Sequence, residues 1–225
     1  MNLLCGCFAC MAAFKGYMGE SYIYTAAILM CAAAVFDFLD GFAARLLHAY
    51  SPMGKELDSL ADVVSFGFAP GVISYQFANE IMAAYDNIPF GEYIPFLAFM
   101  IPVFSALRLA KFNIDERQTT SFIGIPVPAN ALFWIGFYFF GMSYGLQNPI
   151  IWAVLVIAFS LLLVSEIPMF SLKFKNYSLK GNYIRYILIL STVIFVSVFG
   201  FGGFAPAIML YILLSLLQNN LPSLK

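Results

Sequence analysis

The chain has 225 residues, of which 62% are hydrophobic and 10% charged, and its formal net charge is −1. Soluble domains carry about 25% charged residues, so this composition excludes an ordinary soluble protein and indicates one embedded in a membrane. The near-neutral charge also argues against nucleic acid as a partner. Because no polar block is long enough to enclose a core of its own, we predict a single integral-membrane domain over residues 1–225.

Hydrophobic runs close to the length of a bilayer-spanning helix, about 20 residues, follow one another along the chain. We therefore predict an all-α polytopic transmembrane bundle of about eight spans, at residues 2–18, 21–48, 57–79, 93–111, 124–144, 149–168, 183–200 and 204–218. A glycine-rich segment between the last two spans, residues 200–206, could form either a tight hairpin or a kink.

The basic residues are distributed unevenly among the predicted loops. Cytoplasmic loops carry an excess of lysine and arginine, which gives the direction of each span. With the amino terminus inside, only Lys15 lies on the outer side, and ten basic residues lie on the cytoplasmic side: Arg45, Lys55, Arg108, Lys111, Arg117, Lys173, Lys175, Lys180, Arg185 and Lys225. We predict a multi-pass protein of the cytoplasmic membrane.

Four aspartates lie near the predicted cytoplasmic ends of the second and third spans: Asp37, Asp40, Asp58 and Asp62. A carboxylate near the bilayer centre costs about 2.5–3.5 kcal/mol, so intramembrane acids need partners. Residues three or four positions apart share a helix face, so each pair of aspartates points in one direction. Arg45 and Lys55 cannot neutralise all four carboxylates. We therefore predict Mg²⁺ or Mn²⁺, in a site of two ions, since oxygen ligands without histidine favour these cations over zinc.

The residues between the aspartates favour a phosphate ligand. Gly41 and Ala44 share the helix face of Asp37 and Asp40, and their small size leaves room beside the carboxylates. Arg45, next along the chain, presents a fork of donors that fits phosphate oxygens. The pattern indicates an enzyme that transfers a phosphoryl group to an alcohol.

Two other classes of protein also use intramembrane acids. A cation transporter could pass ions between paired carboxylates, but such a path predicts acids near mid-bilayer on discontinuous helices. A membrane prenyltransferase holds a diphosphate through metals, but a second aspartate-rich motif would be expected after Asp62 and none follows. The transporter remains the non-enzyme alternative.

The aspartates form part of a longer string with fixed spacing. The string resembles the signature of the CDP-alcohol phosphotransferase family at eight positions: Asp37, Asp40, Gly41, Ala44, Arg45, Gly54, Asp58 and Asp62. Within that family the chain looks most like bacterial and archaeal phosphatidylserine synthases, a similarity carried by residues 2–6, 108–113, 122–129 and 166–173. The resemblance weakens over the last two predicted spans.

The resemblance implies a six-helix catalytic core and a homodimer. It implies transfer of the phosphatidyl group from CDP-diacylglycerol to L-serine, giving phosphatidylserine and CMP. The four aspartates would bind metal and Asp62 would also be the general base, while the CDP-lipid would contact Asp37, Gly41, Ala44, Arg45 and Asp58. Another acceptor within the same family, glycerol-3-phosphate or inositol phosphate, stays open at this point.

Two polar residues near the end of the fourth predicted span are candidates for binding serine. Arg108 could pair with the serine carboxylate, and Asn113 could hydrogen-bond its amine or carboxylate. The alternative for Arg108 is a purely topological role as a cytoplasmic anchor.

Overall fold

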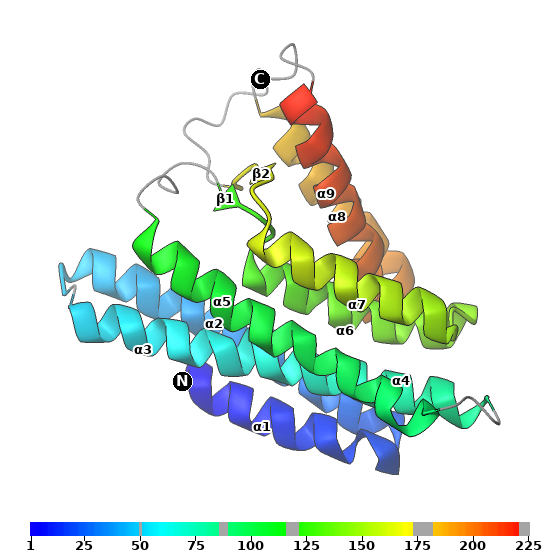
Figure 1. The fold of residues 1–225 in the computed structure, drawn as a ribbon. Helices are drawn as coiled ribbons and strands as arrows, with labels where there is room; N and C mark the ends of the chain where they lie inside the picture. Colours follow the sequence, from blue (N-terminus) through cyan, green and yellow to red (C-terminus); the bar gives the residue numbers. More distant parts are fainter. Residues whose placement is uncertain (50, 86–89, 116–121, 173–181, 221–225) are drawn as a thin grey trace.

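The computed structural model describes residues 1–49, 51–85, 90–115, 122–172 and 182–220, and of Asn220 only the backbone. Within these ranges the chain is almost entirely helical (Figure 1), as predicted. Five of the basic residues behind the predicted orientation, Arg117, Lys173, Lys175, Lys180 and Lys225, lie outside the described residues.

Helices α1 (Asn2–Phe14) and α2 (Glu20–Leu46) form the first pair, joined by the short 3₁₀ helix η1 (Lys15–Met18). They pack along each other through small buried residues, among them Ala9 and Ala13 of α1 and Ala26 of α2. Small side chains let helix backbones approach closely, which is the usual basis of helix packing in membranes. Helix α2 ends two residues earlier than predicted, because His48 has a left-handed backbone with φ 52°.

Helix α3 (Pro52–Asp62), the π-helical segment η2 (Val63–Phe68) and α4 (Ala69–Ala83) form one continuous helical rod. It starts five residues before the predicted span, because Ser51 caps it by accepting a hydrogen bond from the Gly54 backbone N–H at 3.0 Å, and Pro52 occupies its first turn. Pro70, at the start of α4, cannot donate to a helical bond, and a widened π turn accommodates such a position.

The next elements are η3 (Gly91–Phe99), α5 (Met100–Ile114), α6 (Val127–Tyr144) and α7 (Pro149–Val164). Strands β1 (Phe122–Ile123) and β2 (Pro168–Met169) pair antiparallel, with Phe122 opposite Met169. This pairing makes α6 start three residues later and α7 end four residues earlier than predicted, because both flanking segments are extended. The core of the bundle is aromatic, with the rings of Phe133 and Phe159 stacked at 3.7 Å between centroids.

Helices α8 (Tyr183–Phe199) and α9 (Phe204–Asn220) are joined by η4 (Gly200–Gly203). They lie side by side, steeply inclined to α6 and α7 (Figure 1), and α9 packs against α6. The glycine-rich segment is therefore a hairpin and not a kink.

Within the described residues, four helical segments are long and apolar enough to cross a membrane, namely Glu20–Leu46, Pro52–Ala83, Gly91–Ile114 and Tyr183–Asn219. Asn2–Met18 and Pro149–Val164 are shorter apolar helices. The last long segment contains the α8–α9 hairpin, so its 37 residues are not one straight helix. The protein is thus an apolar helical bundle of the membrane type, and the number of eight spans stays a prediction.

Candidate active site

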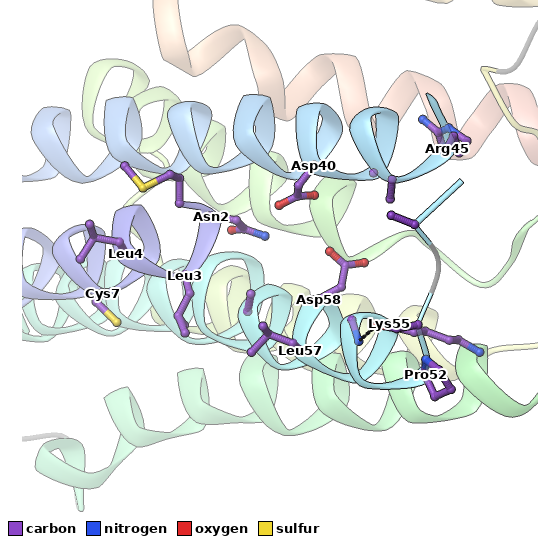
Figure 2. Close-up of a pocket in the computed structure, with 17 residues that line it drawn as sticks. Asn2, Leu3, Leu4, Cys7, Asp40, Arg45, Pro52, Lys55, Leu57 and Asp58 are labelled. Carbon is purple, nitrogen blue, oxygen red and sulfur yellow. Dashed lines mark hydrogen bonds between the residues drawn. The ribbon is translucent and has the colours of Figure 1, made fainter. Parts of the chain in front are cut away.

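A cavity of about 1130 Å³ opens between the start of α1, the second half of α2 and the start of α3. One wall is polar and includes Asp40 and Asp58, which face each other across the space from α2 and α3, with Asn2 of α1 beside them (Figure 2). Another part is apolar and includes Leu3, Leu4, Cys7, Leu57 and Ala61. The cavity therefore offers carboxylates and apolar side chains to one ligand.

Three aspartates come together at this cavity. Asp37, Asp40 and Asp58 each offer a carboxylate oxygen, and these oxygens all lie within 4.8 Å of one another. Asp37 is half-buried, whereas Asp40 and Asp58 are exposed. Helical spacing brings Asp37 and Asp40 to one face of α2, and the short connection to α3 brings Asp58 opposite them.

The donor set fits a divalent cation. Ionised carboxylates are hard oxygen ligands, and three of them within reach of one point match the preference of Mg²⁺, Mn²⁺ and Ca²⁺. Repulsion among three neighbouring carboxylates is unfavourable, and a bound cation would relieve it. The cluster could hold a divalent metal ion.

Asp62 occupies a different environment from the other three acids. It lies one helical turn beyond Asp58, is 9% exposed, and does not belong to the three-carboxylate group within the described residues. Its Oδ1 accepts a hydrogen bond from the Asn2 amide at 2.9 Å, and the same amide donates to Asp37 at 3.2 Å. Asp62 and Asp37 thus share one amide donor, which comes from α1.

The predicted CDP-lipid residues all lie at or beside this cavity. Gly41, Ala44 and Arg45 line it with Asp58, and Asp37 lies in the adjacent carboxylate cluster. An added Cβ at Gly41 would meet no atom of the described residues within 4 Å, so the glycine faces open space. Arg45 and Lys55 stand at the end of the cavity away from Leu4 and Cys7 (Figure 2). The polar end of the cavity thus combines acids with two cations.

The two residues predicted to bind the substrate serine, Arg108 and Asn113, lie farther from the cavity. Arg108 is 3% exposed and its guanidinium lies 5.3 Å from the centre of the Phe112 ring. Asn113 donates from its amide to Ser59 Oγ at 2.9 Å, and its backbone carbonyl accepts from Lys55 Nζ at 2.9 Å. Neither is among the residues that line the described cavity, although Asn113 contacts Lys55, which does line it.

Asn2, Lys55 and Ser59 take part in this site without having been assigned a place in it from the sequence. Asn2 belongs to a short stretch that resembles a family motif, but nothing in its local sequence pairs it with residues 35 and 60 positions away. Lys55 lies three positions before Asp58 and so shares its helix face, which was an available signal, whereas Ser59, one position after Asp58, does not share that face.

The fold and site define a helical membrane-type protein with a carboxylate cluster beside a partly apolar cavity. The sequence profile of CDP-alcohol phosphatidyltransferases matches residues 1–194. The chain belongs to this family.

Several relatives of this chain are named as enzymes that form a serine phospholipid. The CDP-diacylglycerol–serine O-phosphatidyltransferase of Bacillus subtilis is 37% identical over 145 residues, which cover 64% of this chain and 74% of the relative. The enzyme of the same name from Mycobacterium leprae is 38% identical over 151 residues, covering 63% of this chain and 47% of the relative. The archaetidylserine synthase of Methanothermobacter thermautotrophicus is 34% identical over 165 residues, covering 69% of this chain and 64% of the relative. The alignment thus spans about half of the mycobacterial protein.

Proposed function

We propose that this protein transfers the phosphatidyl group of CDP-diacylglycerol to L-serine, forming phosphatidylserine and releasing CMP. The observation that carries the proposal is a cavity at which clustered carboxylates, Arg45 and an apolar wall meet. Family membership supports the CDP-linked donor, and the names of the relatives support serine as the acceptor.

The cavity accounts for both parts of such a donor. Arg45 and Lys55 can pair with diphosphate oxygens, and Gly41 leaves room for the nucleotide beside α2. Leu3, Leu4 and Leu57 offer apolar surface to the acyl chains, which then need not leave the lipid phase. A lipid substrate can therefore react at the membrane surface while CMP and serine exchange with water.

Asp37, Asp40, Asp58 and Asp62 would hold the divalent cation, and we propose Mg²⁺ or Mn²⁺ in two sites. When bound, such ions offset the negative charge of the diphosphate and of the departing CMP. Asp62 would accept the proton of the serine hydroxyl as that oxygen attacks the lipid-side phosphorus and the bond to the CMP oxygen breaks. Its burial beside α1 shields this carboxylate from water.

Arg108 and Asn113 remain our candidates for serine recognition. The Asn113 amide donates a hydrogen bond to Ser59, and Ser59 is the residue next to Asp58 on α3. Asn113 therefore lies near the carboxylate cluster. If Arg108 binds the serine carboxylate, Arg108→Ala raises the KM for serine while the affinity for CDP-diacylglycerol stays unchanged. Lys111→Gln is the matched control, because Lys111 is the next cation on α5 and pairs with Glu166. An unchanged KM for serine in Arg108→Ala would exclude it from recognition.

The function is tested by CMP release from CDP-diacylglycerol by the purified protein in nanodiscs. We expect release that requires both L-serine and Mg²⁺ or Mn²⁺, and that falls by about a thousandfold in Asp62→Asn, the range lost with a general base. Glu92→Gln is the control. Glu92 is an exposed acid at the start of η3, whereas Asn113 lies at the far end of α5, the helix that continues η3. CMP release with glycerol-3-phosphate or inositol phosphate, and not with serine, would show that the acceptor is one of these two alcohols. Absence of release with every acceptor, together with metal uptake into liposomes, would favour transport.

We further propose that the site faces the cytoplasm and that the protein is a homodimer. Arg45 and Lys55 lie at the cavity end of the helices, whereas Glu20 and Glu92 begin α2 and η3 at the other end, a distribution that supports this orientation. An impermeant maleimide should label His48→Cys only from the cytoplasmic side and Glu92→Cys only from the other, in a chain without its native cysteines.

Native mass spectrometry in nanodiscs tests the dimer.

A further inference from the structure

Asn2, at the start of α1, contacts both helices that bear the aspartates. Its side chain is buried, with 2% of the residue exposed. The Nδ2 amide donates to Asp37 Oδ1 at 3.2 Å and to Asp62 Oδ1 at 2.9 Å. An amide NH₂ has two hydrogens, so each carboxylate receives one of them. A single side chain therefore connects α2 to α3 within the site.

The orientation of this amide follows from its surroundings. The Asn2 Oδ1 atom is buried and has no hydrogen-bond partner among the described residues. Turning the amide over would satisfy nothing, because it would place this acceptor against two carboxylate oxygens that are also acceptors. The two donated bonds therefore determine the orientation of the amide, although its own carbonyl oxygen then has no partner among the described residues.

The backbone of Asn2 is fixed by the segment that follows Asp62. Ser65 of η2 donates its hydroxyl to the Asn2 carbonyl oxygen at 3.2 Å, and both residues are buried. The close approach depends on Gly6 of α1, where an added Cβ would lie 2.2 Å from Ser65 Oγ and 2.9 Å from Ser65 Cα. Helix α1 can thus reach the acids because it meets η2 at a glycine.

We propose that Asn2 is a positioning residue that sets the separation of Asp62 from the carboxylate cluster. Its donated bonds reduce the repulsion between the Asp37 and Asp62 carboxylates and hold one oxygen of each. Hydrogen bonds from neighbouring residues to metal ligands affect metal affinity strongly, since they fix ligand orientation. The inference rests on the proposed function in taking these acids as a cation site.

Direct Mn²⁺ binding to the purified protein tests the inference without any substrate. Electron paramagnetic resonance of Mn²⁺ in nanodiscs gives the affinity of the unmodified chain, of Asn2→Leu, which keeps the size of the side chain without its donors, and of Met11→Leu. We expect about tenfold weaker binding in Asn2→Leu, the lower range for loss of a residue that orients metal ligands. Met11 is 57% exposed on the same helix and lies away from the acids, so Met11→Leu should bind Mn²⁺ as the unmodified chain does.

A second variant covers the case in which Asn2→Leu does not fold. Ser65→Ala keeps the Asn2 side chain and removes only its backbone partner, so a smaller loss of Mn²⁺ affinity in the same direction is expected. Unchanged affinity in the folded variants, or no Mn²⁺ binding by the unmodified chain, would overturn the inference. If Mn²⁺ affinity falls as expected but the unmodified chain releases no CMP, the proposed function fails and the role of Asn2 stands.

Discussion

The two halves of helix α2 have opposite surroundings. From Glu20 to Ala33, which we call the closed half, it buries Ile23, Met30 and three alanines. From Ala34 to Leu46, the open half, it buries no residue, and it presents Asp37, Asp40, Gly41 and Ala44 on or beside the cavity. Small residues recur on both halves, but those that are fully buried all lie in the closed half.

This difference shows that the same kind of side chain has two uses along one helix. In the closed half, alanines allow α1 to approach α2, and the contact is filled by protein atoms. In the open half, Gly41 and Ala44 border empty space, which a ligand can fill. Substitutions in the closed half should therefore change stability, and substitutions in the open half should change activity.

Among the substitutions that test this comparison, the largest effect should come from Asp58, which faces the open half of α2 from α3 (Figure 2). Asp58→Asn removes one of three clustered carboxylates, so CMP release should fall by about a hundredfold or more, with weaker Mn²⁺ binding. Glu56→Gln is the matched control, because Glu56 is an exposed acid on the same turn of α3 outside the cluster. Equal activity in the two variants would contradict a metal site at Asp58.

A large residue in the closed half should act on folding. Ala27 is 0% exposed, so Ala27→Leu overfills the contact around α2 and should destabilise the protein by about 1–3 kcal/mol. Thermal unfolding in detergent measures this effect, with Ala44→Leu as the matched substitution in the open half. If both variants lose stability equally, the distinction between the two halves is wrong.

The same Ala44→Leu variant should weaken binding of the CDP-lipid. The added side chain projects into the cavity beside Arg45. A steric clash of this size should lower kcat/KM for the CDP-lipid by at least about tenfold. We expect a higher KM for CDP-diacylglycerol with an unchanged melting temperature. A raised KM for serine alone would instead place the acceptor next to Ala44.

The smallest expected effect is at Ser59, the neighbour of Asp58 on α3. Ser59→Ala removes the bond from the Asn113 amide, which is worth about 0.5–1.5 kcal/mol in a typical protein setting. If Asn113 recognises serine, the KM for serine should rise about threefold, with that for CDP-diacylglycerol unchanged. A change in melting temperature without a change in either KM would show a structural bond only.

The helical elements were largely predictable because hydrophobic length is a local property of the chain. The ends were less so, since they depend on caps and contacts such as the Ser51 cap of α3 and the β1–β2 pairing. The hairpin at residues 200–203 was one of two interpretations of its glycines, and only the packing of α9 against α8 decided between them.

The sequence by itself determined which acids share a helix face, because helical geometry fixes positions three and four residues apart. It therefore predicted the pairing of Asp37 with Asp40 and their small neighbours Gly41 and Ala44. Only the tertiary structure decided that Asp58 joins this pair while Asp62 shares the Asn2 amide with Asp37. The physical reason is that contacts between distant helices depend on how closely their backbones approach, which here a glycine facing Ser65 permits.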